Sequence, residues 1–130
     1  MGVGRAQYPG ATKFVAKRTD IEGYFAVGAT GAVGDISCRG VESITRNAAG
    51  KYTVVLKDVY SNLVGWDVKF LHATASTVGG VELLSEAVAT VGTQNVVIQC
   101  RNYSGTGADP ASGSRMYITL KLNNTNLPIA

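Results

Sequence analysis

Reactive side chains are scarce in this chain of 130 residues, which has two cysteines and one histidine. Cys38 and Cys100 are too far apart in the sequence to form a CxxC redox pair, and their spacing does not fit a zinc-ligand cluster. His72 has no second histidine or nearby cysteine with which to form a metal site or a triad. We therefore expect no enzyme, no metal, no cofactor and two buried thiols. A disulfide between two sheets is the alternative interpretation.

Long hydrophobic runs are also missing. No segment approaches the roughly 18 consecutive apolar residues that a membrane-spanning helix needs, and the N-terminal sequence MGVGRAQYPG lacks the apolar region of a signal peptide. The chain is 45% hydrophobic with 16 glycines and only 3 prolines, which is too apolar for a disordered protein. These features predict one globular domain that is made and kept in a cytoplasm-like compartment, with no membrane partner.

Charged residues make up only 16% of the chain, and they are unevenly placed. The first 18 residues carry four basic residues and no acidic one, whereas the rest of the chain has a slight excess of acid. A nucleic-acid-binding domain usually shows a denser basic stripe with aromatic residues between the charges. We therefore expect no nucleic-acid partner, and a basic N-terminal arm that is solvated or docked on another protein. Its basic residues are Arg5, Lys13, Lys17 and Arg18.

Alternation of apolar and polar residues predicts several strands, because successive side chains of a strand point to opposite faces. In residues 51–57, KYTVVLK, one face holds Tyr52, Val54 and Leu56. The other inward-facing sets are Trp66, Val68 and Phe70, with His72 at the rim; Val96, Ile98 and Cys100; and Met116, Ile118, Leu120 and Leu122.

Further strands are predicted in the first half of the chain. Short runs rich in aromatic and β-branched residues at 13–18 and 22–27 predict two strands separated by a Thr-Asp pair. Residues 36–46 predict one longer strand that bends at Gly40. The turn at 47–50 ends in a glycine that is free to adopt a positive φ, and it predicts a hairpin with the strand that follows.

Three other segments are irregular in pattern. Residues 81–91 fit either a short helical turn or an irregular strand, since apolar residues follow neither period throughout. The Gly/Ser-rich stretches 28–34 and 103–114 predict exposed loops. We expect the second to be a long hairpin loop between neighbouring strands of one sheet, and loops of that length are often functional or mobile.

Seven or eight short strands with frequent turn signals predict an all-β fold, a two-sheet β-sandwich of jelly-roll or Ig-like order with an extended N-terminal arm. The expected organisation is an arm at residues 1–12, a sandwich at 13–126 and a C-terminal tail at 127–130.

Few residues suggest a catalytic or phosphate-binding site. Asp20 and Glu22 are spaced to share one face of a strand, and we interpret them as solvated charges and not as an acid–base pair. The glycines of 28–34 lack the Lys-Ser/Thr that follows them in a phosphate-binding loop.

A sugar-binding sandwich would carry exposed aromatic residues on a face or in loops. Tyr8, Tyr60 and Tyr103 are the candidates, whereas Trp66 is expected to be buried. In the loop 103–114, Tyr103 and Asp109 are the candidate ligand-binding residues.

One pattern suggests a family. The segments on which the resemblance rests are VESITRNAAGKYTVVL at 41–56, the Trp/Phe strand after it, VVIQCR at 96–101, ADPASG at 108–113 and MYITLKLNN at 116–124. Their order over about residues 36–126 resembles small virion proteins of tailed bacteriophages, in particular capsid cement or decoration proteins.

The resemblance implies a β-sandwich that binds the outer face of an assembled capsid and bridges neighbouring major capsid proteins, so that the head is stabilised. It implies a location on the virion surface after synthesis in the host cytoplasm, no enzymatic activity, and self-association as a dimer or trimer. The 18-residue arm extends up to roughly 60 Å when stretched, enough to reach a neighbouring subunit. The capsid-contact candidates are Arg5, Tyr8, Pro9, Lys13, Lys17 and Arg18. The alternative function is a receptor- or glycan-binding module of a phage tail fibre or head appendage.

Overall fold

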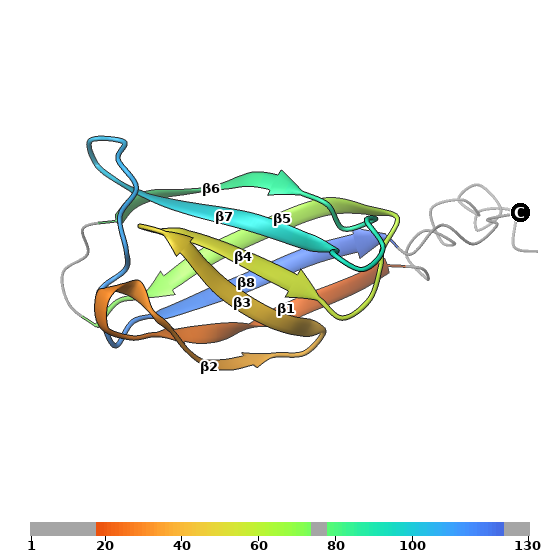
Figure 1. Ribbon diagram of the computed structural model, residues 1–130, viewed down its shortest axis with the longest axis horizontal. Helices are drawn as coiled ribbons and strands as arrows, with labels where there is room; N and C mark the ends of the chain where they lie inside the picture. The colour runs from red at the N-terminus through yellow and green to blue at the C-terminus, as the bar shows by residue number, and fades with distance from the viewer. Residues whose placement is uncertain (1–17, 74–77, 124–130) are drawn as a thin grey trace, which may run out of the picture.

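Eight strands form the part of the protein that the structure, a computed structural model, describes: residues 18–73 and 78–123. They are β1 (Arg18–Val27), β2 (Val33–Cys38), β3 (Val41–Ala48), β4 (Lys51–Leu56), β5 (Asn62–Leu71), β6 (Val78–Glu86), β7 (Asn95–Asn102) and β8 (Arg115–Asn123), with a short 3-10 turn, η1 (Ala29–Gly31), after β1. The strands form two antiparallel sheets, in the orders β2-β1-β8-β5 and β3-β4-β7-β6 (Figure 1). The predicted all-β, two-sheet sandwich is confirmed. In these two ranges no helix is long and apolar enough to cross a membrane.

The first and last strands pair in the middle of one sheet, with Arg18 opposite Asn123. Because of this pairing, β1 begins and β8 ends at the same end of the sandwich, on the right in Figure 1. The η1 turn, the β3–β4 hairpin and the loop 103–114 lie at the opposite end. Ig domains place strands A, B, E and D in one sheet and C, F and G in the other, so the order found here differs from the Ig order.

The core lies between the two sheets and is filled by the inward side chains of the central strands. Tyr52, Val54 and Leu56 are fully buried, as the alternation in β4 predicts. The predicted inward residues of β7 and β8 are also buried: Val96, Ile98, Cys100, Met116, Ile118, Leu120 and Leu122. Burial of each large apolar side chain contributes about 1.5–3 kcal/mol relative to an exposed one, and this term favours the sandwich.

The prediction of one long strand across residues 36–46 is wrong. β2 pairs with β1 in one sheet, whereas β3 pairs with β4 in the other. Gly40 adopts φ +88°, a left-handed conformation that favours glycine, and a Cβ on it would lie 3.1 Å from Cδ1 of Ile21. The chain turns there from one sheet to the other. Alternation continues on both sides of such a turn, so the pattern does not reveal the change of sheet.

The loop 103–114 also crosses between sheets and is not a hairpin loop, because β7 and β8 belong to different sheets. β1 is one continuous strand from Arg18, so the expected break at the Thr-Asp pair is wrong as well. In the ambiguous stretch 81–91, the irregular strand is correct as far as Glu86, and β6 has a register shift against β7 between Leu83 and Ser85. Residues 87–91 lie outside the strand, where the N–H of Thr90 donates to the carbonyl of Ala87. The hairpin at 47–50 is confirmed, and Gly50 has φ +71°.

Candidate binding surfaces

Several turns meet at one end of the sandwich, where the carboxylate of Asp109 connects them. Arg46 in β3 donates from Nε to Oδ1 at 3.0 Å and from Nη2 to Oδ2 at 2.7 Å. The backbone N–H of Gly50 donates to Oδ1 at 2.7 Å. Gly31 of η1 lies against the same group, because a Cβ on it would be 2.4 Å from Cγ of Asp109. Asp109 thus ties the loop 103–114 to the β3–β4 hairpin, and its predicted role in ligand binding stays a prediction.

The electrostatics of this end follow from the same contacts. Partial burial raises the pKa of Asp109, but the hydrogen bonds from Arg46 and Gly50 outweigh it, so the pKa lies below its ordinary value. Burial, and then the negative charge of Asp109, raise the pKa of Tyr52. The neutral Tyr52 hydroxyl donates to the carbonyl of Gly31 at 2.7 Å. These charged and neutral hydrogen bonds therefore fix η1, the β3–β4 hairpin and the loop 103–114 relative to one another.

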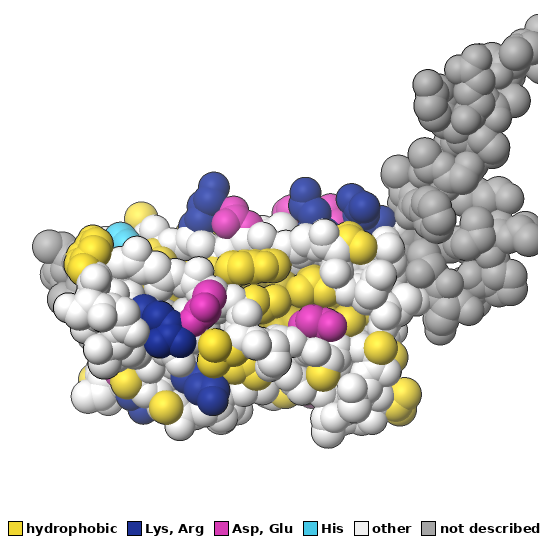
Figure 2. Space-filling model, turned by 90° about the horizontal axis from the view of Figure 1, so that it is seen from above, with side chains coloured by type: hydrophobic (Ala, Val, Ile, Leu, Met, Phe, Trp, Pro, Cys, Tyr) yellow, Lys and Arg dark blue, Asp and Glu magenta, His cyan; other side chains and the backbone are white. Residues whose placement is uncertain are grey.

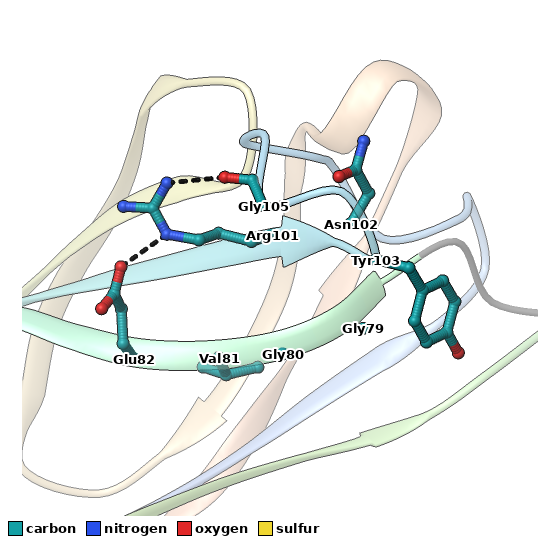
Figure 3. Close-up of a pocket in the computed structure, with 8 residues that line it drawn as sticks. All are labelled: Gly79, Gly80, Val81, Glu82, Arg101, Asn102, Tyr103 and Gly105. Atoms are coloured by element: carbon teal, nitrogen blue, oxygen red, sulfur yellow. Dashed lines mark hydrogen bonds and ion pairs between the residues drawn. The ribbon is translucent and has the colours of Figure 1, made fainter.

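A cleft of about 350 Å³ lies beside this end, between the start of β6 and the end of β7 (Figure 3). Arg101 lies at one end of the cleft, where its Nε donates to Oε1 of Glu82 at 2.6 Å and its Nη1 donates to the carbonyl of Gly105 at 3.0 Å. At the other end lies the ring of Tyr103, which is 82% exposed. It rests beside Gly79, where a Cβ would be 2.6 Å from the ring.

The turn that carries Tyr103 is ordered by its own hydrogen bonds. The side-chain oxygen of Asn102 accepts from the backbone N–H groups of Ser104 at 2.9 Å and Thr106 at 3.0 Å. The backbone N–H of Asn102 donates to the carbonyl of Thr106 at 2.8 Å. An exposed aromatic ring on an ordered turn, a guanidinium and a carboxylate therefore lie around one cleft. Such groups can stack on and hydrogen-bond to a sugar or a short peptide.

A second surface is the open edge, which we define as Leu63, Trp66 and Phe70 of β5 with Val81 and Leu83 of β6. β5 and β6 are the edge strands of the two sheets on the same side of the sandwich. By register these five side chains point inward, yet none is fully buried, and Trp66 is 40% exposed. Figure 2 shows apolar side chains gathered in a band along this side, between the two sheets, with charged groups on both flanks.

The candidate residues from the sequence are dispersed. Trp66 was expected in the core, and that prediction is wrong: an inward side chain on an edge strand has a neighbour strand on one side only. Tyr60 is 6% exposed, so it is a core residue and no binding group. Arg18 is exposed at the start of β1. The other arm candidates lie outside the described residues: Arg5, Tyr8, Pro9, Lys13 and Lys17.

The titratable candidates are spread over the sandwich in the same way. Cys100 is fully buried, and burial followed by the charge of Asp109 raises its pKa to about 12. Cys38 is half-buried and burial raises its pKa too. Both thiols are free, so the predicted burial is confirmed for Cys100, holds in part for Cys38, and the disulfide alternative is wrong. His72 is exposed at the rim and stacks on Phe70 with ring centroids 5.4 Å apart.

Sequence reasoning missed the partners in these surfaces. Arg46 and Asp109 are 63 positions apart, and no local pattern pairs them. Glu82 and Arg101 meet only because β6 pairs with β7. The exposed carboxylates Asp20 and Glu22 lie on β1. Within residues 18–73 and 78–123, no three His, Cys, Asp or Glu side chains form a metal-binding group.

Comparison with known proteins finds no match for this chain. No protein-family model matches it. No curated protein and no solved structure matches it either. The resemblance to capsid cement proteins therefore remains a pattern in the sequence.

Proposed function

We propose that this protein is a structural virion component that binds the outside of a phage capsid and links neighbouring major capsid proteins. The observation that carries the proposal is the position of the chain ends. β1 begins opposite the end of β8, with Arg18 opposite Asn123, so the 17 residues before Arg18 start from the same end of the sandwich as those after Asn123. A basic segment and a second tail at one end suit a protein that anchors itself on a repeating acidic surface.

The sequence resemblance supports the same proposal. Its segments correspond to β3, β4, β5, β7 and β8, which build most of the two sheets. In this proposal the sandwich is a compact spacer, and the arm supplies the contacts with the capsid. Many weakly bound copies on one lattice then give a high overall affinity, because binding at repeated sites is multivalent.

Capsid binding by the purified full chain tests the proposal directly. We expect stoichiometric binding to expanded heads, measured by co-sedimentation, and heads that are more resistant to heat. Removal of residues 1–12 should weaken binding by about tenfold or more while the circular dichroism spectrum is unchanged. Arg5→Glu should weaken binding in a salt-dependent way.

Lys51→Glu is the matched control, because it makes the same charge change at the opposite end of the sandwich from the arm. It should bind like the wild type. Absence of binding by the full chain would refute the proposed function, whereas equal binding by the truncated chain would remove only the arm from it.

A second candidate function is a receptor- or glycan-binding module of a tail fibre or head appendage. The cleft between Tyr103 and the Glu82–Arg101 pair favours it, because an exposed ring at one end and fixed polar groups at the other are the elements of a sugar subsite. Gly79→Ala provides a test, since the added methyl would meet the Tyr103 ring and displace it.

Glycan-array binding that is lost in both Tyr103→Ala and Gly79→Ala would support this second function. Gly28→Ala is the control, because Gly28 is not among the residues that line the cleft, has φ −97°, and would place its Cβ 3.6 Å from the carbonyl oxygen of Ala32, an ordinary contact. An array with no signal for the wild type would refute the glycan-binding function.

A further inference from the structure

β5 is an edge strand whose free side is available for pairing with another strand. It is ten residues long, contains no proline, and among the strands that the structure describes it pairs only with β8. An edge of this kind presents unpaired N–H and C=O groups that can template another strand, and proteins usually blunt it with inward charges, bulges or proline. β5 has one register shift against β8, between Leu63 and Gly65, and its pairing is regular beyond it. The inward side chains from residue 66 to residue 70 are Trp66, Val68 and Phe70, and none is charged. This regular part of the edge is therefore suited to pairing.

The outward side of the same segment carries one charge of each sign. Asp67 and Lys69 lie on the outer face of the sheet and contact each other, with Nζ and Oδ2 3.5 Å apart. Both side chains are more than half exposed, at 55% for Asp67 and 77% for Lys69. An exposed pair of this kind contributes little to the stability of a single copy. Its order along the strand, acid then base on either side of Val68, is nevertheless self-complementary.

We propose that β5 pairs antiparallel with β5 of a second copy of this chain, about a two-fold axis at Val68. Such an isologous contact joins two copies of one surface. In this register Asp67 faces Lys69 of the second copy and Lys69 faces Asp67 of the second copy, which gives two attractive cross-strand pairs. On the inner side, Trp66 faces Phe70 of the second copy, and an aromatic cross-strand pair is among the more stabilising kinds. Trp66 would lose solvent exposure in the dimer.

The charges also exclude the neighbouring registers. An axis at residue 67 places two Asp67 carboxylates opposite each other, and an axis at residue 69 does the same with two Lys69 ammonium groups. Like charges directly opposite each other are destabilising. An axis between two residues would place inward side chains opposite outward ones, which conflicts with burial of one face. In the Val68 register, Leu71, which is 56% exposed, faces Gly65 of the second copy, where no side chain obstructs it.

Two observables test the contact in the full chain: sedimentation velocity over a concentration series, and fluorescence of Trp66, the only tryptophan. We expect the wild type to dimerise with a blue shift of the tryptophan emission as concentration rises. Asp67→Lys and Lys69→Asp should each raise the dimer Kd by about tenfold or more, because each turns two attractive pairs into two repulsive ones.

An equimolar mixture of Asp67→Lys and Lys69→Asp proteins should form a heterodimer, because lysines of one copy then face aspartates of the other. A general loss of stability would not be repaired by mixing. The controls are Asp35→Lys on β2, at the opposite edge of the same sheet, and Lys57→Asp after β4, which make the same charge changes. Both should dimerise like the wild type.

A wild type that remains monomeric throughout the series would overturn the proposal. So would a dimer whose Kd is unchanged in both single variants, or two single variants that stay monomeric when mixed. If the open edge is instead covered by the chain's own first 17 residues, the wild type will be monomeric, and deletion of residues 1–12 will shift the Trp66 emission. The contact concerns copies of this chain in solution, so these outcomes do not depend on capsid binding.

Discussion

Asp109→Ala is the substitution with the clearest energetic consequence, because the carboxylate has three hydrogen bonds within the protein. Arg46 remains one-third exposed in the contact, so water can replace much of what its guanidinium loses. The backbone N–H of Gly50 is buried and would be left without its acceptor. A buried donor that loses a charged partner costs about 1.5–3 kcal/mol. We expect the free energy of unfolding to fall by about 2 kcal/mol.

Chemical denaturation at one fixed protein concentration measures this change, with circular dichroism and Trp66 fluorescence as independent probes. Asp109→Asn is the informative companion, because its amide oxygen can still accept from Gly50 while its charge is gone. We expect it to lose less than half of what Asp109→Ala loses. A loss below about 0.5 kcal/mol in Asp109→Ala would refute the reasoning, since that is the range of unremarkable surface substitutions.

The pH dependence provides a second check on the same group. The pKa of Asp109 is lower in the folded protein than in the unfolded chain. The unfolded state therefore binds a proton first as pH falls, and stability contributed by the carboxylate is lost on acidification. The difference in stability between the wild type and Asp109→Asn should be constant above about pH 5 and should shrink below about pH 4, near the ordinary aspartate pKa. A difference that grows on acidification would contradict the assigned sign.

Two further predictions concern the same end of the sandwich and the thiols. Gly50→Ala should destabilise the protein by more than about 3 kcal/mol, or prevent folding, because Gly50 has φ +71° and its Cβ would lie 2.4 Å from the carbonyl oxygen of Ala108; normal yield and stability would contradict this. In the native protein a thiol reagent should modify Cys38 faster than Cys100, which is fully buried and has a pKa of about 12; mass spectrometry of partly labelled protein would show equal labelling if the assignment were wrong.

Much of the fold was predictable because burial imposes a period of two on the central strands. The inward sets of β4 and β8 alternate over their whole length and are buried in the structure as predicted. The predicted inward residues of β7 are buried too, together with the outward Gln99. What alternation does not encode is the sheet to which a strand belongs. β2 and β3 have the pattern of one strand, yet a glycine with positive φ sends them to different sheets. The same limit applies to β7 and β8, which the loop 103–114 joins across the sandwich.

The candidate surfaces were less predictable, because they depend on contacts between distant segments. Tyr103 was identified from its Gly/Ser-rich loop, but the cleft beside it exists only because β6 runs alongside the end of β7. Asp109 was identified as well, yet its carboxylate is occupied by Arg46 and Gly50. The exposure of Trp66 follows from the position of β5 at the edge of a sheet. Strand order is a global property, and local hydrophobic patterns contain no direct signal for it.

The proposed dimer contact determines where the two N-terminal arms leave the pair of sandwiches, and the arms are the proposed capsid contacts. Arg18, Asn123 and Asn62 lie in one row across β1, β8 and β5, so the N-terminal arm leaves the sandwich near the start of β5. In an antiparallel pair about Val68 the two β5 strands begin at opposite ends, about 40 Å apart at about 3.3 Å per residue. The two arms of the proposed dimer would therefore leave from opposite ends.

A dimer with arms at opposite ends can bind two capsid sites at once, and its second contact is effectively intramolecular. Asp67→Lys should then bind expanded heads about tenfold or more weakly than the wild type even though its arm is intact. Addition of an equal amount of Lys69→Asp protein should restore the affinity, because the charge pairs form again in the mixed dimer. Equal capsid affinity of Asp67→Lys and wild type, measured by co-sedimentation at matched concentrations, would show that the capsid contact does not use the β5 pairing.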